Sequence, residues 1–477
     1  MPVSDYEPVI GLEVHAQLLT RSKIFCPCAT SFGAGPNTQV CPTCLGLPGA
    51  LPALNRGAVE MAVKAGKALG SRIARRSIWS RKNYFYPDLP KGYQISQFDL
   101  PICVGGAVPV LQPDGSVKSV RLTRIHLEED AGKSIHGAQG SEVDLNRSGT
   151  PLVEIVGEPD LRSAEEASDY LKSLRLIVMY LGINDGNLEE GSFRCDANVS
   201  IRKRGAETYG TRVELKNINS FRYVRQAIDF EIARQAQVLD AGGRVSMETR
   251  LYDHEKDETR PMRSKEEAND YRYFPEPDLP ELLLTDAFID SITVDKLPHE
   301  RYAGLLAAGV SAADARTIIH DVRLALLHGM LTAVGGEGSA RRAANAVVGE
   351  VSRLLNEKAI DLEDPKFTPD QVAEVWALQD AGALSSSRAR EVLAEVLQTG
   401  KRASEIVEAR GLSQVSDTGA LEAVVDAVLR RSPGEVEKYR AGKKNLLGFF
   451  VGAAMKELKG KGNPGVLNGL FKQKLGD

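Results

Sequence analysis

The chain of 477 residues is too long for a single hydrophobic core, so we expect two to four domains. Its 60 basic and 64 acidic residues exclude a uniformly basic nucleic-acid-binding protein, and any contact with RNA must come from a local patch. The amino terminus has no basic region leading into an apolar core, and the apolar run at residues 446–455 is too short to span a membrane. These features predict a cytoplasmic protein without a secretory signal.

The first predicted element is a strand over residues 10–18, because apolar and polar residues alternate there with a period of two. Glu13 and His15 share its polar face, where a carboxylate and an imidazole two residues apart could hold a hard cation. An ordinary strand with one exposed face has the same pattern. Only the similar faces further along the chain favour the cation site.

Four of the six cysteines lie within 19 residues, which is not typical of a disulfide framework. The two close pairs, separated by a turn-rich loop, can bring four thiolates to the corners of a tetrahedron and so predict a structural zinc site. Four buried thiols without a metal are the alternative. The predicted ligands are Cys26, Cys28, Cys41 and Cys44.

Residues 55–69 have helical spacing, and residues 81–93 then break every regular pattern. Prolines and glycines among aromatic residues predict a stiff loop in which rings could stack on a base while Arg81, Lys82 and Lys91 meet phosphate. A surface loop closed by its own aromatic residues is the alternative. A similar stretch at 271–280 favours two loops that line one cleft.

Several further predicted strands carry charged residues on one face. Glu154 is a single carboxylate within the apolar strand 151–156, where its burial is costly unless a metal or another cation accompanies it. The other charged faces belong to Arg124, His126 and Glu128 in one strand, and to Glu142 and Asp144 in another.

Two later strands, residues 193–201 and 212–217, present the richest polar faces. Oxygen ligands of this kind suit Mg²⁺, and the basic groups could neutralise a phosphoryl group in transfer. The chain has neither a phosphate-binding glycine loop of the Walker type nor a protein-kinase signature, so a kinase site here would be built on an antiparallel sheet. These faces consist of Arg194, Asp196 and Asn198, followed by Arg212, Glu214 and Lys216.

The second half of the chain has a different texture. Residues 223–239 are predicted to form a helix, and the large domain is expected to close near residue 292. Alanine, leucine and charged residues at helical period predict a helical domain over 293–405, with helix starts at Thr368-Pro369 and at Ser385. A last module covers 406–477; its end, residues 438–477, has nine basic and two acidic residues, and Lys443 and Lys444 are candidate tRNA contacts. A solvated lysine-rich helix would look the same.

Over essentially its full length the chain resembles the GatB/GatE family, which supplies the B subunits of tRNA-dependent amidotransferases. The resemblance is carried by long, specific strings: Ile10-Gly-Leu-Glu-Val-His-Ala-Gln17, Arg81-Lys-Asn-Tyr-Phe-Tyr-Pro-Asp-Leu-Pro90, His126-Leu-Glu-Glu-Asp130, Gly149-Thr-Pro-Leu-Val-Glu-Ile-Val156, Arg194-Cys-Asp-Ala-Asn-Val-Ser200 and Glu214-Leu-Lys-Asn-Ile-Asn219.

The resemblance implies an α+β fold with three parts: a mainly antiparallel cradle-shaped catalytic domain, an all-α helical domain and a small YqeY-like helical tail that reaches the tRNA. It also implies a carbon–nitrogen ligase. In this reaction ATP phosphorylates the side-chain carboxylate of Glu-tRNA(Gln) or Asp-tRNA(Asn), and ammonia then displaces the phosphate. The positions Glu13, His15, Glu128 and Glu154 are implied magnesium residues, with Asp196 and Glu214 close by. Arg194, Asn198 and Lys216 are added as phosphate-binding residues on strand geometry alone.

The resemblance also implies partners. No amidase arrangement of serine and lysine is evident, so ammonia is expected from a separate amidase, the glutaminase chain of the family's complex. A third, small chain would complete a GatCAB heterotrimer that acts on misacylated tRNA. Members of the family differ in whether they keep the cysteine quartet. Two readings compete with this one: a non-catalytic RNA-binding scaffold, and a zinc hydrolase, which is disfavoured because two cysteine pairs leave no open coordination position.

Overall fold

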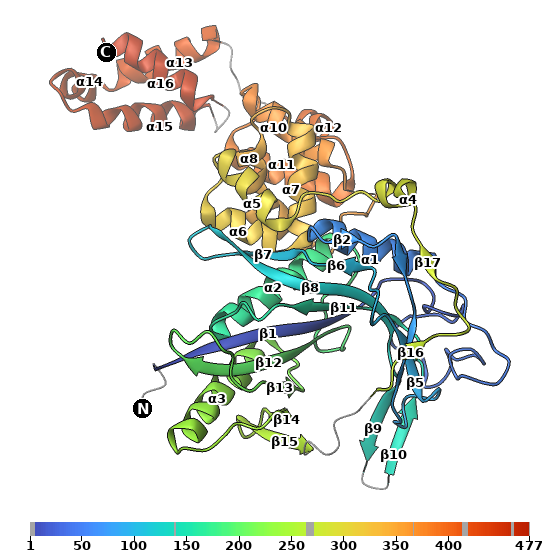
Figure 1. Ribbon diagram of the computed structural model, residues 1–477. Helices are drawn as coiled ribbons and strands as arrows, with labels where there is room; N and C mark the ends of the chain where they lie inside the picture. Colours follow the sequence, from blue (N-terminus) through green and yellow to red (C-terminus); the bar gives the residue numbers. More distant parts are fainter. Residues whose placement is uncertain are drawn as a thin grey trace. The chain divides into compact units, whose positions relative to one another are not determined.

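The computed structural model describes residues 5–137, 140–263, 271–365, 367–412, 418–458 and 462–476 (Figure 1). The chain divides into two compact units, Met1–Arg301 and Tyr302–Asp477. Strands and helices mix in the first unit, whereas every regular element described in the second unit is helical. The predicted α+β class is confirmed.

The first unit is organised around one large sheet. Its strand pairs are antiparallel except for β13 and β14, which run parallel. The strands follow the order β15 (Glu258–Arg263), β14 (Glu248–Asp253), β13 (Val213–Lys216), β12 (Phe193–Lys203), β1 (Tyr6–Gln17), β11 (Pro151–Gly157), β8 (Val117–Glu129), β6 (Cys103–Val104) and β2 (Arg72–Ile73), with β7 (Ala107–Leu111) also paired to β8.

Small sheets extend from this core. The prediction that residues 81–93 are all loop is wrong in part. Residues 81–83 belong to the strand β4, and only residues 84–92 form the loop that connects β4 to β5. The strand forms there because its backbone pairs with strands on both sides, and the prolines begin only at Pro87. The small sheets are β9 (Lys133–Gly137) with β10 (Gly140–Asp144); β4 (Ser80–Asn83) between β5 (Tyr93–Ser96) and β16 (Phe274–Pro275); and β3 (Arg76–Ser77) with β17 (Leu282–Leu283).

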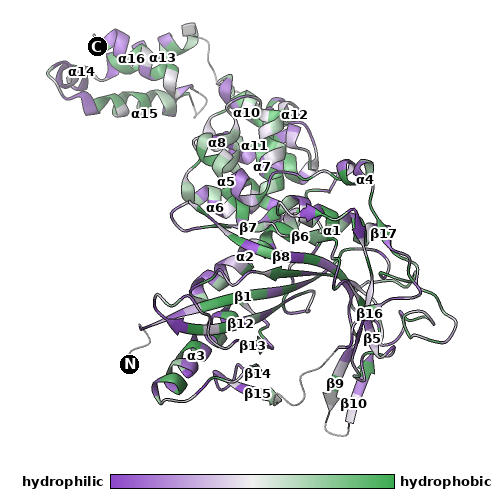
Figure 2. Cartoon of the chain, in the orientation of Figure 1, coloured by the Kyte–Doolittle hydropathy of each residue, from purple (hydrophilic) through white to green (hydrophobic). Residues whose placement is uncertain are grey.

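The helices α1 (Arg56–Ala68), α2 (Ala164–Tyr180) and α3 (Phe221–Asp240) pack against the large sheet, and α4 (Asp286–Ser291) follows later. Side chains of Asn55, Ser163 and Ser220 cap the first three helices by accepting hydrogen bonds from backbone N–H groups of the first turn. Hydrophobic and hydrophilic residues share each helix (Figure 2), as expected for helices with one buried face. The helices predicted at 55–69 and 223–239 are confirmed.

The core of the first unit joins these helices to one face of the sheet. In β1, Ile10, Leu12 and Val14 are buried in the same cluster as Val63 of α1 and Leu171 of α2. The alternation predicted for the first strand is therefore confirmed, and it turns Glu13 and His15 to the opposite face.

The second unit begins within α5 (Pro298–Ala307). Thr368 and Gln371 form a capping box at the start of α10, and Ser385 caps α11, as the sequence predicts. The further elements are α6 (Ala312–His320), α7 (Val322–Gly335), α8 (Ala340–Val348), α9 (Glu350–Glu357), α10 (Pro369–Asp380), α11 (Ser386–Thr399), α12 (Ala403–Arg410), α13 (Thr418–Arg431), α14 (Pro433–Arg440), a 3₁₀ turn (Lys444–Leu446), α15 (Leu447–Glu457) and α16 (Pro464–Leu475).

In the described ranges no single helix is long and apolar enough to cross a membrane. Only α6 and α7 taken together, with a bend of 114° between them, meet the requirements of length and composition.

Candidate active site

The polar face of the large sheet gathers the predicted site residues from five strands. Strand register sets them in rows: His126 of β8 lies opposite Glu154 of β11, which lies opposite His15 of β1, which lies opposite Arg194 of β12. In the neighbouring row Glu13 lies opposite Asp196. Residues that are directly opposite in antiparallel strands share a face and are close neighbours, so the register places these charged groups side by side.

Three of the predicted magnesium residues converge on one point. Nε2 of His15 lies 3.6 Å from Oε1 of Glu128 and 3.6 Å from Oε2 of Glu154. One ligand atom from each of these residues lies within 4.8 Å of the others, a spacing that suits a metal ion. Glu13, the fourth predicted residue, is outside this triplet and accepts a hydrogen bond of 2.8 Å from Nδ2 of Asn198.

One oxygen of the triplet has no hydrogen bond. Glu128 is only 2% exposed, and its Oε2 is buried with no hydrogen-bond partner among the described residues. The nearest cationic atom, Nζ of Lys82, is 3.9 Å away. Because a buried carboxylate oxygen is costly to leave unbonded, this atom is a strong acceptor ready for a cation.

Charges within the site shift the pKa values of its residues in opposite directions. Burial acts to raise the pKa of Glu154, but His126 and His15 outweigh it and hold the pKa well below its ordinary value. Burial acts to lower the pKa of His15, but Glu154 and Glu128 outweigh it and raise the pKa. Burial and the charge of Glu154 raise the pKa of Glu13. Perturbations of this kind, clustered on one face, are typical of functional sites.

A second acidic group lies beside the triplet. Nζ of Lys216 is 2.6 Å from Oδ2 of Asp196 and 3.1 Å from Oε1 of Glu214. Burial acts to lower the pKa of Lys216, but these two carboxylates raise it overall, so the lysine stays charged. The predicted residues Asp196, Glu214 and Lys216 are thus brought together on adjacent strands.

Arg194 has a different environment from the one its strand position suggests. Its Nη2 lies 2.9 Å from Oδ2 of Asp130, which also accepts a hydrogen bond of 2.8 Å from Gln17. Asp130 is buried, and Arg194 and Arg147 lower its pKa against the effect of burial. Arg194 is therefore neutralised by the protein itself, and it does not line the cavity described next.

A cavity of about 560 Å³ opens over the polar face. Tyr86 of the loop between β4 and β5 and Tyr271 and Tyr273 of the later aromatic stretch line the same cavity, so the predicted pairing of the two stretches is confirmed. Its charged and amide lining residues are Glu13, His15, Lys82, Gln97, Arg124, His126, Glu154, Asp196, Asn198, Arg212, Glu214, Lys216 and Glu248.

The three cations predicted in the first loop have separate roles. Arg81 makes a bidentate contact with Glu276, with distances of 2.7 and 2.9 Å, and Lys91 pairs with Glu129. Only Lys82 lines the cavity, where the carboxylates of Glu128 and Glu154 raise its pKa despite its burial.

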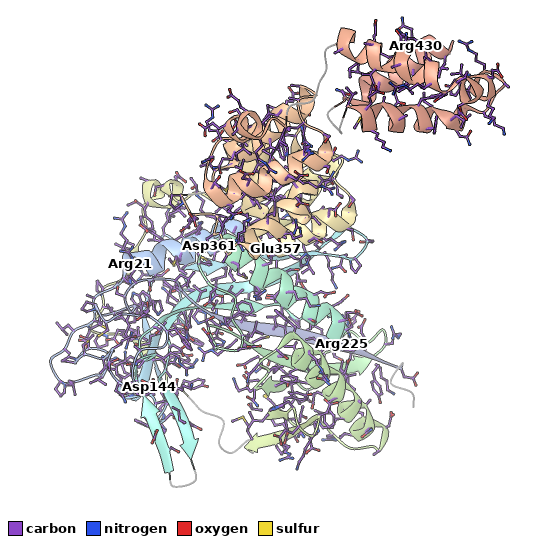
Figure 3. All side chains as sticks on the ribbon, turned by 180° about the vertical axis from the view of Figure 1, so that it is seen from behind. Arg21, Asp144, Arg225, Glu357, Asp361 and Arg430 are labelled. Carbon is purple, nitrogen blue, oxygen red and sulfur yellow. The ribbon has the colours of Figure 1, made fainter. Side chains whose placement is uncertain are left out.

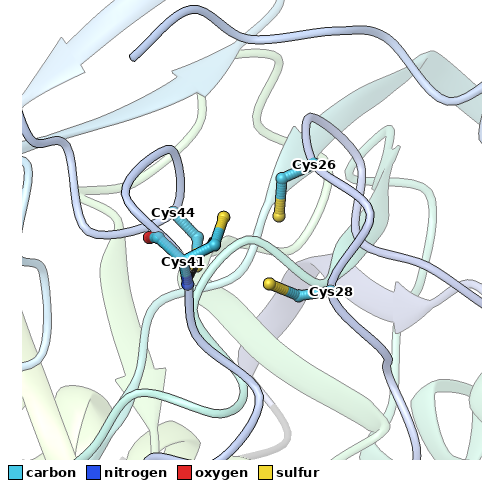
Figure 4. A group of neighbouring side chains, drawn as sticks. All are labelled: Cys26, Cys28, Cys41 and Cys44. Atoms are coloured by element: carbon cyan, nitrogen blue, oxygen red, sulfur yellow. Dashed lines mark hydrogen bonds between the residues drawn. The ribbon is translucent and has the colours of Figure 1, made fainter. Parts of the chain in front are cut away.

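The four clustered cysteines form a separate group in the first unit. All four are unpaired, their sulfur atoms lie within 4.8 Å of one another, and the sulfurs of Cys26 and Cys28 point toward Cys41 and Cys44 (Figure 4). The loop that carries the second pair is held against β10, because the N–H of Asn37 donates to Oδ1 of Asp144 at 3.0 Å (Figure 3 labels Asp144). Such a group can bind a metal ion.

The chain is similar to known proteins over nearly its whole length. The family model for the GatB/GatE catalytic domain matches residues 8–290, and a second model, for the GatB domain, matches residues 330–475. The chain belongs to the GatB/GatE family. The relatives of this GatB/GatE chain include proteins named as the B subunit of aspartyl/glutamyl-tRNA(Asn/Gln) amidotransferase from Anaeromyxobacter sp. (58% identical), Myxococcus xanthus (54%) and Syntrophotalea carbinolica (54%). The match covers all of the chain and of the relative in the first two cases, and 99% of each in the third.

Sequence reasoning about this GatB/GatE chain assigned no site role to two residues, although it placed His126 on a charged strand face. His126 is 3% exposed, and its Nε2 lies 3.1 Å from Oε2 of Glu154; Asp130 is the buried partner of Arg194. The signal for His126 was its position two residues before Glu128, on the same strand face. Asp130 follows the strand directly and carried no comparable periodic signal.

The carboxyl-terminal helices of this GatB/GatE chain have a small core of their own, formed by residues including Leu421, Phe450 and Phe471. Nζ of Lys444 lies 4.6 Å from the centroid of the Tyr439 ring, and Lys443 precedes the 3₁₀ turn. Of the basic residues counted at this end, Lys459 and Lys461 lie outside the described residues.

Proposed function

We propose that the chain is the subunit that activates and amidates the amino acid on a misacylated tRNA. It phosphorylates the side-chain carboxylate of Glu-tRNA(Gln), Asp-tRNA(Asn) or both with ATP, and ammonia then replaces the phosphate. The observation that carries this proposal is the convergence of His15, Glu128 and Glu154, of which His15 and Glu154 line the cavity, with one oxygen of Glu128 left without a hydrogen bond. The names of the relatives agree with the substrate class.

The residues present fit a magnesium ion. His15, Glu128 and Glu154 would hold it, with Glu13 beside them, because carboxylate oxygens predominate and the unbonded Oε2 of Glu128 needs a cationic partner. When bound, Mg²⁺ supplies charge neutralisation to phosphoryl oxygens.

The chain's own cations have a matching role. Lys82, Arg124, Arg212 and Lys216 line the same cavity, where they would attract the triphosphate and stabilise the negative charge that develops during transfer. Asp196 and Glu214 would hold Lys216 in position, and Asn198 would orient Glu13. The carboxylate to be amidated is a poor electrophile until phosphorylation gives it a leaving group, so the kinase step must come first.

The chain is proposed to work in a complex. Ammonia would come from the amidase (glutaminase) chain, and a third, small chain would complete the GatCAB heterotrimer. The tail, residues 406–477 with Lys443 and Lys444, would contact the tRNA backbone, while residues 1–292 and 293–405 would form the catalytic and helical domains. Deleting 406–477 should weaken tRNA binding and reduce its salt dependence; an unchanged salt slope would contradict this role.

We propose that zinc occupies the cysteine group as a structural ion. Four sulfurs within 4.8 Å of one another supply a closed ligand set with no position left for a substrate. Metal analysis of the purified protein should give one equivalent of zinc, and less than half an equivalent would count against the site.

The deciding experiment uses the reconstituted complex with Glu128→Gln and Glu154→Gln. ATP hydrolysis that depends on misacylated tRNA should fall strongly in both variants, while the exposed Glu142→Gln serves as the matched control. Unchanged turnover in both variants would favour the competing function, a tRNA-binding scaffold without catalysis. Parallel amidation assays with Glu-tRNA and Asp-tRNA would then define the substrate.

A further inference from the structure

A fully buried lysine lies beside the cysteine group. Lys23 is 0% exposed, and its Nζ donates to the carbonyl oxygen of Gln39 at 2.7 Å and to that of Leu145 at 3.4 Å. The third acceptor is Sγ of Cys44 at 3.6 Å. An ammonium group has three donors, so all three are used, and one of them is directed at a sulfur.

This ammonium has no carboxylate partner among the described residues. The nearby Lys91, which lines the same small cavity of about 190 Å³, pairs with the carboxylate of Glu129. Lys23 instead meets two neutral carbonyls and one sulfur. Because a buried charge is costly unless it is paired, the sulfur is the one neighbour able to supply the missing negative charge, as a thiolate.

We propose that Lys23 is the built-in counter-cation of the metal-bound cysteine group and that it secures retention of the metal. Four thiolates around one zinc ion carry a net charge of minus two, which is costly in a buried site. One ammonium beside Cys44 offsets half of that charge and holds the sulfur in place. The proposal rests on the proposed zinc site and adds to it a positioning residue from outside the four ligands.

The placement of Lys23 also couples two segments. Gln39 lies in the loop between the cysteine pairs, and Leu145 follows β10, so one ammonium joins the metal loop to the hairpin end that also binds Asn37 through Asp144. Outer partners that orient metal ligands commonly change metal affinity about 10- to 100-fold when removed.

The test compares zinc retention in Lys23→Met and Lys23→Gln. Glutamine keeps amide donors for the carbonyls but removes the charge. We expect both variants to bind zinc at least tenfold more weakly in a chelator competition, and to shift the thiolate-to-metal charge-transfer band of the cobalt-substituted protein. Lys67→Met is the matched control, because Nζ of Lys67 donates to the carbonyls of Ile289 and Ile292 at 3.0 and 2.6 Å and to no sulfur.

The outcomes separate the two proposals. If the wild-type protein binds no zinc, the zinc site itself fails. If it binds zinc and Lys23→Gln retains it as tightly, only the role of Lys23 fails. Should both variants misfold, acetylation of the wild-type protein decides: Lys23 should be protected in the zinc-loaded protein and labelled after chelation, and equal labelling in both states would overturn the proposal.

Discussion

Two buried carboxylate clusters in the first unit differ in how many hydrogen-bond donors and cations the protein places around them. Glu231 of α3 is 0% exposed, and its oxygens accept hydrogen bonds from Arg234, Gln235 and Thr259 at 2.6 to 3.2 Å. Arg250 lies 3.6 Å away as a second cation. Glu128 is almost as deeply buried, yet its Oε2 has no hydrogen bond, and its nearest neighbours include another carboxylate, across His15.

The difference separates a carboxylate with a structural role, Glu231, from a proposed magnesium ligand, Glu128. Burial alone does not separate them, because both are inaccessible to solvent. Glu231 has enough donors and cations within the chain to hold its charge, so its cluster joins α3 to β14 and β15. Glu128 has Lys82 and His15 within 4 Å, but its Oε2 accepts no hydrogen bond from the described residues and is left open to a bound cation.

Among these variants, Glu231→Ala is expected to have the largest effect on the free energy of unfolding. Removing this carboxylate leaves the buried donors of Gln235 and Thr259 without their acceptor and Arg234 and Arg250 with Glu248 as their remaining carboxylate, which should lower the free energy of unfolding by about 3 kcal/mol. Urea unfolding measures this, with the half-exposed Glu60→Ala as control, since surface ion pairs contribute little. A loss below 1 kcal/mol would remove the contrast between the clusters.

Glu128→Gln should give the opposite pattern. We expect amidation by the assembled complex to fall about 10²- to 10³-fold, because the neutral amide loses the negative charge that would hold the proposed cation. The free energy of unfolding should stay unchanged or rise, since two carboxylates no longer share one imidazole. Steady-state kinetics and urea unfolding of the same preparation check both parts, and a destabilised but active enzyme would refute the assignment.

Tyr86→Ala tests the aromatic wall of the cavity. Tyr86 is 51% exposed, so its ring contributes little to folding but can stack on a base, a contact worth about 1–3 kcal/mol. We expect kcat/KM for ATP or for the aminoacyl-tRNA to fall about tenfold or more, with Tm unchanged. Phe85→Ala, on the same loop but outside the cavity lining, is the control. Equal losses in the two variants would point to a general effect on the loop.

The smallest effect on stability is expected for a carboxylate in the second unit that already accepts hydrogen bonds from the protein. Glu374 of α10 accepts hydrogen bonds from the backbone N–H groups of Ala403 and Ser404 and from the Ser404 hydroxyl, at 2.6 to 3.3 Å. Burial acts to raise the pKa of Glu374, but these donors lower it overall. The stabilisation is therefore present above the unfolded-state pKa and is lost as the pH falls through the folded-state pKa.

Glu374→Gln should accordingly cost about 1 kcal/mol at pH 7, because the site is partly solvated. The difference from wild type should be smaller at about pH 4 than at pH 7, because the stabilisation from a carboxylate with a lowered pKa is lost as the pH falls toward its folded-state pKa. Urea unfolding at the two pH values measures it. A difference that does not change with pH would show that the loss of stability comes from the shape of the side chain and not from its charge.

The sequence predicted which face of a strand each side chain occupies better than it predicted which strands lie next to one another. Alternation in β1 and β12 was enough to orient Glu13, His15, Asp196 and Asn198, because side chains in a strand alternate by necessity. Strand order depends on contacts between distant segments, and no local pattern indicates that β1 lies between β11 and β12. His126 was therefore overlooked as the partner of Glu154.

The same limit explains the misread environment of Arg194. Its strand position indicates the correct face, but its charge is neutralised by Asp130, a residue that follows β8 and reaches it only through the folded sheet. The predicted loop at residues 81–83 failed for a related reason, because β4 exists through pairing with β5 and β16 rather than through its own composition.

The central place of β1 in the sheet has a consequence for biosynthesis. Residues 6–17 of β1 are translated well before both of its hydrogen-bonding neighbours, β11 and β12, which are complete only at residue 203. Until then the nascent chain exposes a strand with two open edges, which is the kind of segment that aggregates. Chaperones that shield emerging chains should therefore engage this protein early and release it only after β12 has been synthesised.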